Sequence, residues 1–71
     1  MNRRFEFVAG NSAKFWEISQ SGCTVTVRFG RLGAARQELH KGFEDKKAAI
    51  KYAQKLVAQK IAKGYVECVP V

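Results

Sequence analysis

Apolar and polar residues alternate along the first two-thirds of the chain, which is the period of half-buried β-strands. The pattern predicts strands at residues 4–8, 14–19 and 23–29, with turn residues between them. The third is the clearest, because its two faces differ in chemistry. One face carries Val25, Val27 and Phe29, and the other carries Thr24, Thr26 and Arg28. A weaker fourth strand is predicted at residues 36–43, with Leu39 and Gln37 facing inward. Because the connections are too short for parallel strands, the four strands should form an antiparallel meander.

The last third of the chain predicts one helix over residues 46–63, which contain neither Gly nor Pro. Asp45 is the expected N-cap and Gly64 the expected C′ glycine. At about 100° per residue, one broad arc collects Ala49, Ile50, Tyr52, Ala53, Leu56, Val57 and Ile61. We therefore predict a single α+β domain over residues 1–71, with an antiparallel sheet of about four strands and one C-terminal helix packed across it.

Three features leave alternatives open. Lys60 falls inside the apolar arc, so either its stem carries the ammonium out to water or the ammonium lies at the edge of a polar site. Phe15 and Trp16 are adjacent in one strand, so one of the two rings must point away from the core; we take Trp16 as a core residue. Residues 66–71, with Pro70 next to last, form either a short strand or a tail.

Charge narrows the classes of partner. Thirteen Lys and Arg against six Asp and Glu give a net charge of +7, which attracts polyanions and speeds their association. Nucleic acid, an anionic membrane surface and an acidic protein all fit this charge. A membrane is disfavoured, because the core uses the apolar face of the helix and no aromatic-rich amphipathic segment is left over. With no signal peptide and no apolar run long enough to span a bilayer, we expect a cytoplasmic monomer, associated with the nucleoid if the protein is bacterial.

Residues for catalysis or metal binding are few. Cys23, Cys68 and His40 are too few for a zinc site, which needs about four ligands. The two cysteines either form one disulfide or, as we favour, stay reduced and mostly buried. His40 has no nucleophile near it, and helix capping explains Glu44 and Asp45. The chain also lacks a phosphate-cradling or dinucleotide-binding motif. We therefore predict no catalytic, cofactor or metal site, and a protein that is not an enzyme.

The most specific stretch is Phe29-Gly30-Arg31-Leu32-Gly33. An aromatic ring can stack on a base or sugar while the neighbouring guanidinium binds a phosphate bidentately. The glycines allow a sharp bend or a close approach of a ligand to the backbone. The alternative is a strand–loop–strand connection whose aromatic residue belongs to the core, and the local pattern alone favours this alternative.

Taken with other segments, the stretch resembles a WGR domain. This module is named for a Trp-Gly-Arg tripeptide and occurs in DNA-break-sensing poly(ADP-ribose) polymerases and in bacterial proteins. Lys14-Phe15-Trp16-Glu17-Ile18 is similar to the family's second strand, and nearly the whole chain is covered. Further matches follow in order at Gln37, Phe43, Ala49, Leu56, Lys60, Gly64 and Tyr65. The resemblance implies a sheet crossed by one helix, and an accessory module that contacts DNA near a break and touches neighbouring domains.

Two departures bear on recognition. Phe29 stands at the name-giving Trp, which gives a smaller stacking platform without an indole N–H, and Arg36 replaces a glycine of the loop. The resemblance implies that Phe29 stacks, that Gly30 permits close approach and that Arg31 contacts a phosphate or a partner. Other basic residues are further candidates for nucleic-acid contact: Arg28, Arg36 and Lys41 near the loop, and Lys47, Lys51 and Lys55 on the helix, where a merely solvated surface is the alternative.

The predicted function is sequence-independent DNA binding through phosphate contacts, with ends or nicks as favoured targets and RNA as the other candidate ligand. The rival prediction is a protein-interaction module that docks on a partner domain through the Phe29-Gly30-Arg31 loop. Salt distinguishes the two, because phosphate binding weakens steeply with salt while docking through an aromatic anchor does not.

Overall fold

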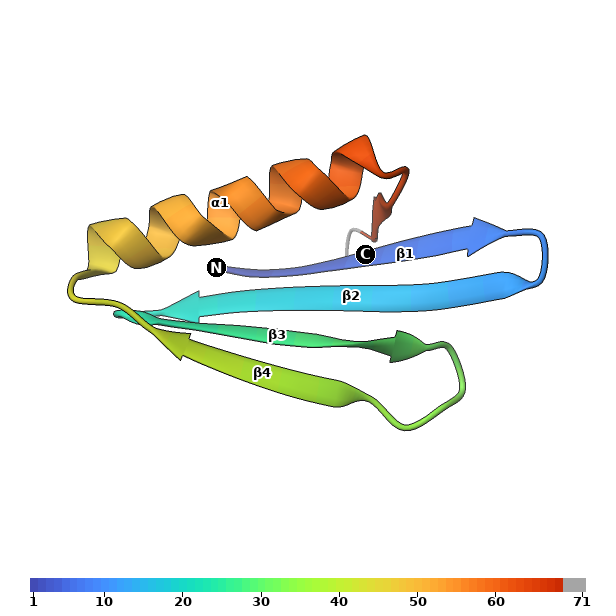
Figure 1. The fold of residues 1–71 in the computed structure, drawn as a ribbon, viewed down its shortest axis with the longest axis horizontal. Coiled ribbons are helices and arrows are strands. Elements are labelled where there is room, and N and C mark those ends of the chain that lie inside the picture. Colours follow the sequence, from blue (N-terminus) through green and yellow to red (C-terminus); the bar gives the residue numbers. More distant parts are fainter. Residues whose placement is uncertain (69–71) are drawn as a thin grey trace.

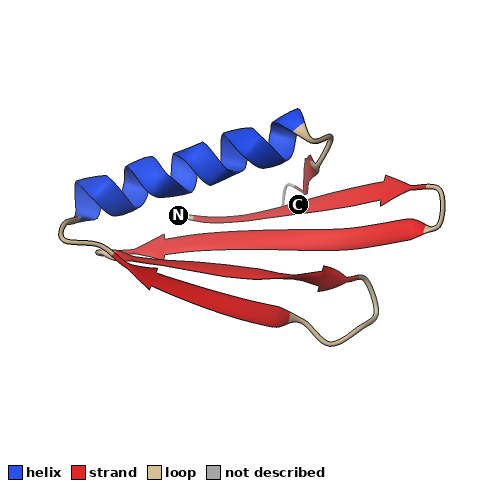
Figure 2. Cartoon of the chain, viewed as in Figure 1, coloured by secondary structure: helices blue, strands red, loops and turns tan. Residues whose placement is uncertain are grey.

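The computed structural model describes residues 1–68 as a five-stranded antiparallel sheet with one helix across one face (Figures 1 and 2). The strands are β1 (Asn2–Ala9), β2 (Ser12–Ser21), β3 (Thr24–Arg31), β4 (Gln37–Gly42) and β5 (Val66–Cys68), and the helix is α1 (Lys46–Ala62). Their order in the sheet is β4-β3-β2-β1-β5. The α+β class and the meander of the first four strands are confirmed, and β5 adds a short fifth strand beside β1. Pro70 lies outside the described residues.

Strand alternation decides which side chains meet the helix. Phe5 of β1 stands opposite Trp16 of β2, and Trp16 stands opposite Phe29 of β3. The rings of Phe5 and Trp16 lie 5.6 Å apart within the core, where Trp16 is only 4% exposed. Phe15 must then point to the opposite face, because successive side chains of a strand alternate. The structure thus confirms Trp16 as the core member of the pair.

Helix α1 begins as predicted and packs through small residues. The Asp45 carboxylate accepts a hydrogen bond from the Ala48 backbone N–H at 2.7 Å, which satisfies one of the free donors of the first turn. The buried stripe consists of Ala49, Ala53 and Val57. The stripe continues three residues beyond Val57, at the half-buried Lys60, and not four residues beyond it, at Ile61. The prediction that Ile61 faces the sheet is therefore wrong, and its side chain is 53% exposed.

The turn after α1 has the hydrogen bonds of a Schellman motif. Gly64 has a φ of +97°, and its N–H donates to the Ile61 carbonyl at 3.0 Å. The N–H of Tyr65 donates to the Lys60 carbonyl at 3.1 Å. The C′ glycine is confirmed, and the turn directs the chain into β5. Of the two alternatives for the C-terminal segment, the strand holds for Val66–Cys68.

Strand β4 is the part of the sheet that the helix does not cover. Gln37 and Leu39 lie on the helix-facing side, opposite Phe29 and Val27, but all six residues of β4 are exposed. The predicted inward orientation of Leu39 is confirmed, but its side chain is 60% exposed. The reason is that α1 packs against β2 and β3. An open space is left between the helix and β4.

The two thiols are free, and Cys23 is exposed in the turn between β2 and β3, so its predicted burial is wrong. Residues 1–68 contain no group of three or more His, Cys, Asp or Glu placed to hold a metal ion. No helix among them has both the length and the apolar character needed to cross a membrane.

Candidate nucleic-acid interface

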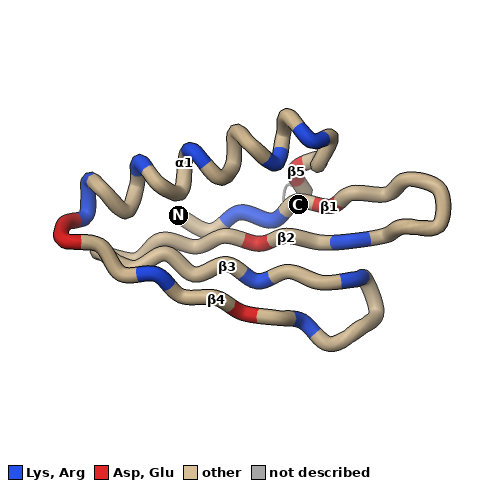
Figure 3. The backbone as a smooth tube through the Cα atoms, in the orientation of Figure 1, with Lys and Arg blue, Asp and Glu red and all other residues tan. Residues whose placement is uncertain are grey.

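Most carboxylates of the chain pair with arginines outside the space beside β4. Figure 3 marks the positions of the acidic and basic residues along the backbone. Arg3 of β1 is paired with Glu67 of β5 at 2.6 Å, and this contact raises the pKa of Arg3 and lowers that of Glu67. Arg28 of β3 is paired with Glu38 of β4 at 2.7 Å. Arg4 reaches two carboxylates on its face of the sheet, those of Glu6 at 3.2 Å and Glu17 at 3.6 Å. The remaining two, Glu44 and Asp45, lie at the start of α1.

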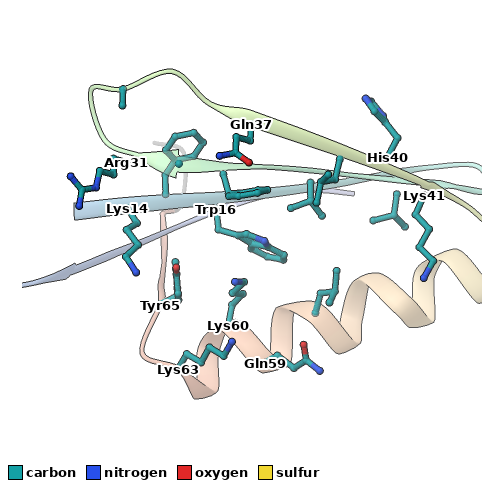
Figure 4. A pocket seen from close by; sticks show the side chains of 18 of the residues that line it. Lys14, Trp16, Arg31, Gln37, His40, Lys41, Gln59, Lys60, Lys63 and Tyr65 are labelled. Atoms are coloured by element: carbon teal, nitrogen blue, oxygen red, sulfur yellow. The ribbon is translucent and has the colours of Figure 1, made fainter. Parts of the chain in front are cut away.

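The space between α1 and the uncovered edge of the sheet forms an open groove of about 990 Å³ (Figure 4). Its floor comes mainly from the helix-facing side of β3 and β4, with Val25, Val27, Phe29, Gln37 and Leu39. The helical wall carries Tyr52, Leu56, Gln59, Lys60 and Lys63, and Lys14 and Tyr65 lie at one end.

The groove is cationic and contains no carboxylate. None of its lining residues is Asp or Glu, and five are Lys or Arg: Lys14, Arg31, Lys41, Lys60 and Lys63. Within residues 1–68, none of these five belongs to a salt bridge. Arg31 and Lys14 are cross-strand neighbours, so they bring two charges to the same end of the groove. Positive charge without an internal counter-charge makes this groove the natural place for an external anion.

Lys60 is the most constrained of these cations. Its Nζ lies 5.5 Å from the ring centre of Trp16 and 5.1 Å from that of Tyr65, so the ammonium sits over two aromatic faces. Burial, and then the charges of Lys63 and Lys14, lower the pKa of Lys60. The Lys60 ammonium therefore lies in the groove, near the charges of Lys63 and Lys14. An anion bound here would offset the repulsion among the three lysines.

A second cation lies over aromatic rings farther along the groove. The Lys41 Nζ lies 4.6 Å from the ring centre of Tyr52 and 5.7 Å from that of Phe43. The Phe43 and Tyr52 rings themselves contact each other, with centres 5.0 Å apart. A lysine ammonium at each end of the groove is thus positioned by cation–π contacts with aromatic rings.

Comparison with known proteins agrees with this fold. The family model described as WGR domain matches residues 1–70. The chain belongs to the WGR domain family. WGR domains are binding modules for nucleic acid, so membership of the family indicates nucleic-acid binding as the general function.

Known relatives are longer than this chain. The chain is 36% identical over 67 residues to the uncharacterized protein YfeS and 38% identical over 65 residues to the protein YehF, both of Escherichia coli K12. It covers 28% and 24% of those two proteins, with 94% and 92% of its own length aligned. A crystal structure of a Bacteroides fragilis protein superposes with a TM-score of 0.92 at 43% identity, over 97% of this chain and 20% of that one. The WGR domain thus spans about a quarter of the two relatives.

The name-giving segment of this WGR domain lies at the groove, although not in the arrangement that its sequence suggests. Arg31 is exposed at the end of the groove where Lys14 lies. Phe29 is half-buried, packs against the core and presents only part of its ring to the groove. A Cβ at Gly30 would lie 3.3 Å from the Ala35 carbonyl oxygen, so the following loop makes the close approach at this glycine.

Several predicted site residues lie away from the groove. Arg28 points to the opposite face of the sheet, where Glu38 pairs with it. Arg36 lies in the loop that covers Gly30. The three helix lysines are exposed and do not line the groove: Lys47, Lys51 and Lys55. Of the additional basic candidates, the structure brings only Lys41 together with Arg31 in the groove.

Sequence reasoning missed Lys14 and Lys63 as groove cations. The signal for Lys14 was present, because alternation places it on the same face as Trp16 and two residues before it. Lys63 was explained by the helix dipole, an effect that it shares with many lysines at helix ends. Only the placement of α1 on the sheet shows that the charges of Lys14 and Lys63 both lie near Lys60.

Proposed function

We propose that this WGR domain binds DNA independently of sequence, with the phosphates held by the cations of the groove. One observation carries the proposal: five Lys or Arg line the groove without any Asp or Glu, while the arginines outside it are largely paired. Phosphate contacts of this kind supply affinity and orientation but read no bases. The principal phosphate contacts in this proposal are Lys14, Arg31 and Lys60, at the same end of the groove.

We also propose that the domain favours ends or nicks over continuous duplex. A break leaves a free strand end and exposes the face of the terminal base pair. The bases of either can stack on aromatic side chains beside the cations. Phe29 and Tyr65 occupy such positions in the groove. The support is the proximity of aromatic rings and unpaired charges, together with family membership.

A titration with four fluorescent DNAs tests both parts. The ligands are a duplex closed by hairpins at both ends, a blunt duplex, a nicked duplex and a single strand, each at two salt concentrations. Affinity should fall with salt at a log–log slope of roughly −0.9 per phosphate neutralised, with about three to five phosphates contacted. The blunt and nicked duplexes should bind more tightly than the closed one. Weak binding to all four would instead favour docking on a protein partner.

Arg31→Ala and Arg28→Ala form a matched pair, because each removes one positive charge from β3. Arg31→Ala should weaken binding to every DNA sequence alike and flatten the salt slope by about one unit. Arg28→Ala should leave the slope unchanged, because Glu38 already pairs with this guanidinium on the opposite face. Equal effects of the two substitutions would show that overall charge, and not the groove, governs binding.

A further inference from the structure

The middle of the groove is mainly apolar, which phosphate binding alone does not explain. Between its cationic ends the lining includes Phe29, Val27, Leu39 and Leu56, beside the amides of Gln37 and Gln59. Leu39 is 60% exposed on the side of the sheet that faces the helix. An exposed leucine between flanking cations creates a surface for a ligand that has both anionic and flat apolar groups.

The dimensions of the groove suit a strand and not a single ion. Arg31 and Val25 are six residues apart on β3, which is about 20 Å at the rise of an antiparallel strand. On the helical wall, Tyr52 and Lys60 are eight residues apart, or about 12 Å. A stacked nucleic-acid strand rises only about 3.4 Å per nucleotide, so several nucleotides fit along this length.

The cations at the two ends mark where phosphates would lie. Lys60 is held over Trp16 and Tyr65 at one end, and Lys41 is held over Tyr52 at the other. Each aromatic contact limits the freedom of a long side chain, so less entropy is lost when a phosphate binds. The exposed apolar floor between them can then contact bases.

We propose that the groove holds an unpaired strand of nucleic acid, with its phosphates on the Lys60 and Lys41 ends and its bases on the Phe29–Leu39 floor. The proposal rests on the proposed function and specifies the form of its ligand. Paired bases hide their faces in the stack of a duplex, whereas unpaired bases can reach aromatic and apolar side chains. An acidic peptide in extended form fits less well, because extended peptides commonly add to the free edge of a sheet. The floor of this groove is the face of the sheet, where β3 and β4 already pair with each other.

The test compares two oligonucleotides with the same number of phosphates. One is a fluorescent ten-nucleotide thymidine strand, and the other carries abasic sugars throughout. The thymidine strand should bind at least about tenfold more tightly, because base stacking on side chains contributes about 5- to 150-fold per base. Both should show the same salt slope. Equal affinities would overturn the proposal.

Leu39→Ser and Ile61→Ser give a matched pair of variants, because both residues are exposed aliphatics and only Leu39 lines the groove. Leu39→Ser should weaken binding of the thymidine strand about fivefold through lost apolar contact, and should leave the abasic strand unaffected. Ile61→Ser should change neither. Equal effects of the two variants on the thymidine strand would overturn the proposal.

Two further outcomes separate this proposal from the one on which it rests. If base-bearing and abasic strands bind equally and Arg31→Ala weakens both, the groove binds phosphates and the unpaired-strand proposal alone fails. If no nucleic acid binds in a salt-dependent way, both proposals fail. A ten-residue polyglutamate peptide that binds as tightly as the thymidine strand would point to an acidic protein instead.

Discussion

Single residues show where charge and packing conflict. Lys60 lies within the sheet-facing stripe of α1, and its position in the apolar arc could be predicted from helical spacing alone. Its contacts with Trp16 and Tyr65 could not, because the sequence does not reveal which ring of the Phe15–Trp16 pair faces the helix. Both residues are in fact buried, Trp16 under α1 and Phe15, at 7% exposure, on the other face. Because aromatic residues lie on both faces of this strand, the alternation of polar and apolar residues does not indicate which face is toward the helix.

The lowered pKa of Lys60 predicts a pH dependence of DNA binding. Lys60 should lose its proton at a lower pH than a lysine side chain that is free in water. As the pH rises through that lowered pKa, DNA affinity should fall by about tenfold, since one charge-assisted phosphate contact is lost. Titrations at pH 7.5 and at successive values up to pH 10 measure this. Lys60→Arg should remove the dependence, because a guanidinium stays protonated. A pH profile that is unchanged in this variant would contradict the role of Lys60.

Folding stability should respond to the same titration with the opposite sign. Between the lowered pKa of Lys60 and its ordinary value, the unfolded chain binds more protons than the folded one. The contribution of Lys60 to the free energy of unfolding is therefore least favourable at low pH and improves as the pH rises through this window. Urea unfolding of the wild type and of Lys60→Arg should show the difference. A wild-type stability that falls relative to the variant across this window would contradict the assignment.

Secondary-structure elements follow the sequence closely wherever local chemistry decides them. The alternation of β3, the Asp45 cap and the Gly64 stop all depend on neighbouring residues, and all are confirmed. Two features could not be decided from the sequence because they depend on tertiary packing. One is β5, which the sequence left open as a strand or a tail and which pairs with β1 after the turn that follows α1. The other is the exposure of β4, which follows from the path of α1 over β2 and β3.

Gly64→Ala should test how the C-terminal turn supports the groove. The φ of +97° is unfavourable for alanine, and the added Cβ would lie 3.3 Å from the Phe7 ring. We expect the free energy of unfolding to fall by about 1–2 kcal/mol, measured by urea denaturation. Gly42→Ala is the matched control, since its φ is not positive and its Cβ would meet nothing within 4 Å. Similar losses in both variants would contradict the account of this turn.

Charge is segregated at the scale of the whole molecule. A net charge of +7 follows from the sequence and predicts a polyanionic partner, but it does not locate the site. The sequence candidates were therefore spread over the loop, β3 and the outer side of the helix. The structure separates them, because Arg28 is paired and the helix lysines are exposed outside the groove, whereas Arg31 and Lys41 line it. Three further lysines line the groove beside them. The location of the groove depends on the relative placement of α1 and β4, which no local pattern encodes.

The most direct test of the groove as the DNA site compares two triple variants that each remove three positive charges. One changes groove lysines, Lys14, Lys60 and Lys63, to Gln, and the other changes Lys47, Lys51 and Lys55 to Gln. Circular dichroism and urea unfolding establish first that both variants fold. In salt titrations with blunt duplex, the groove variant should lose at least about a hundredfold in affinity, with a slope flattened by about three units. The helix variant should stay within about threefold of wild type with nearly the wild-type slope, because its lysines contact no phosphate. Equal losses in the two variants would contradict the central claim and leave overall charge as the cause of binding.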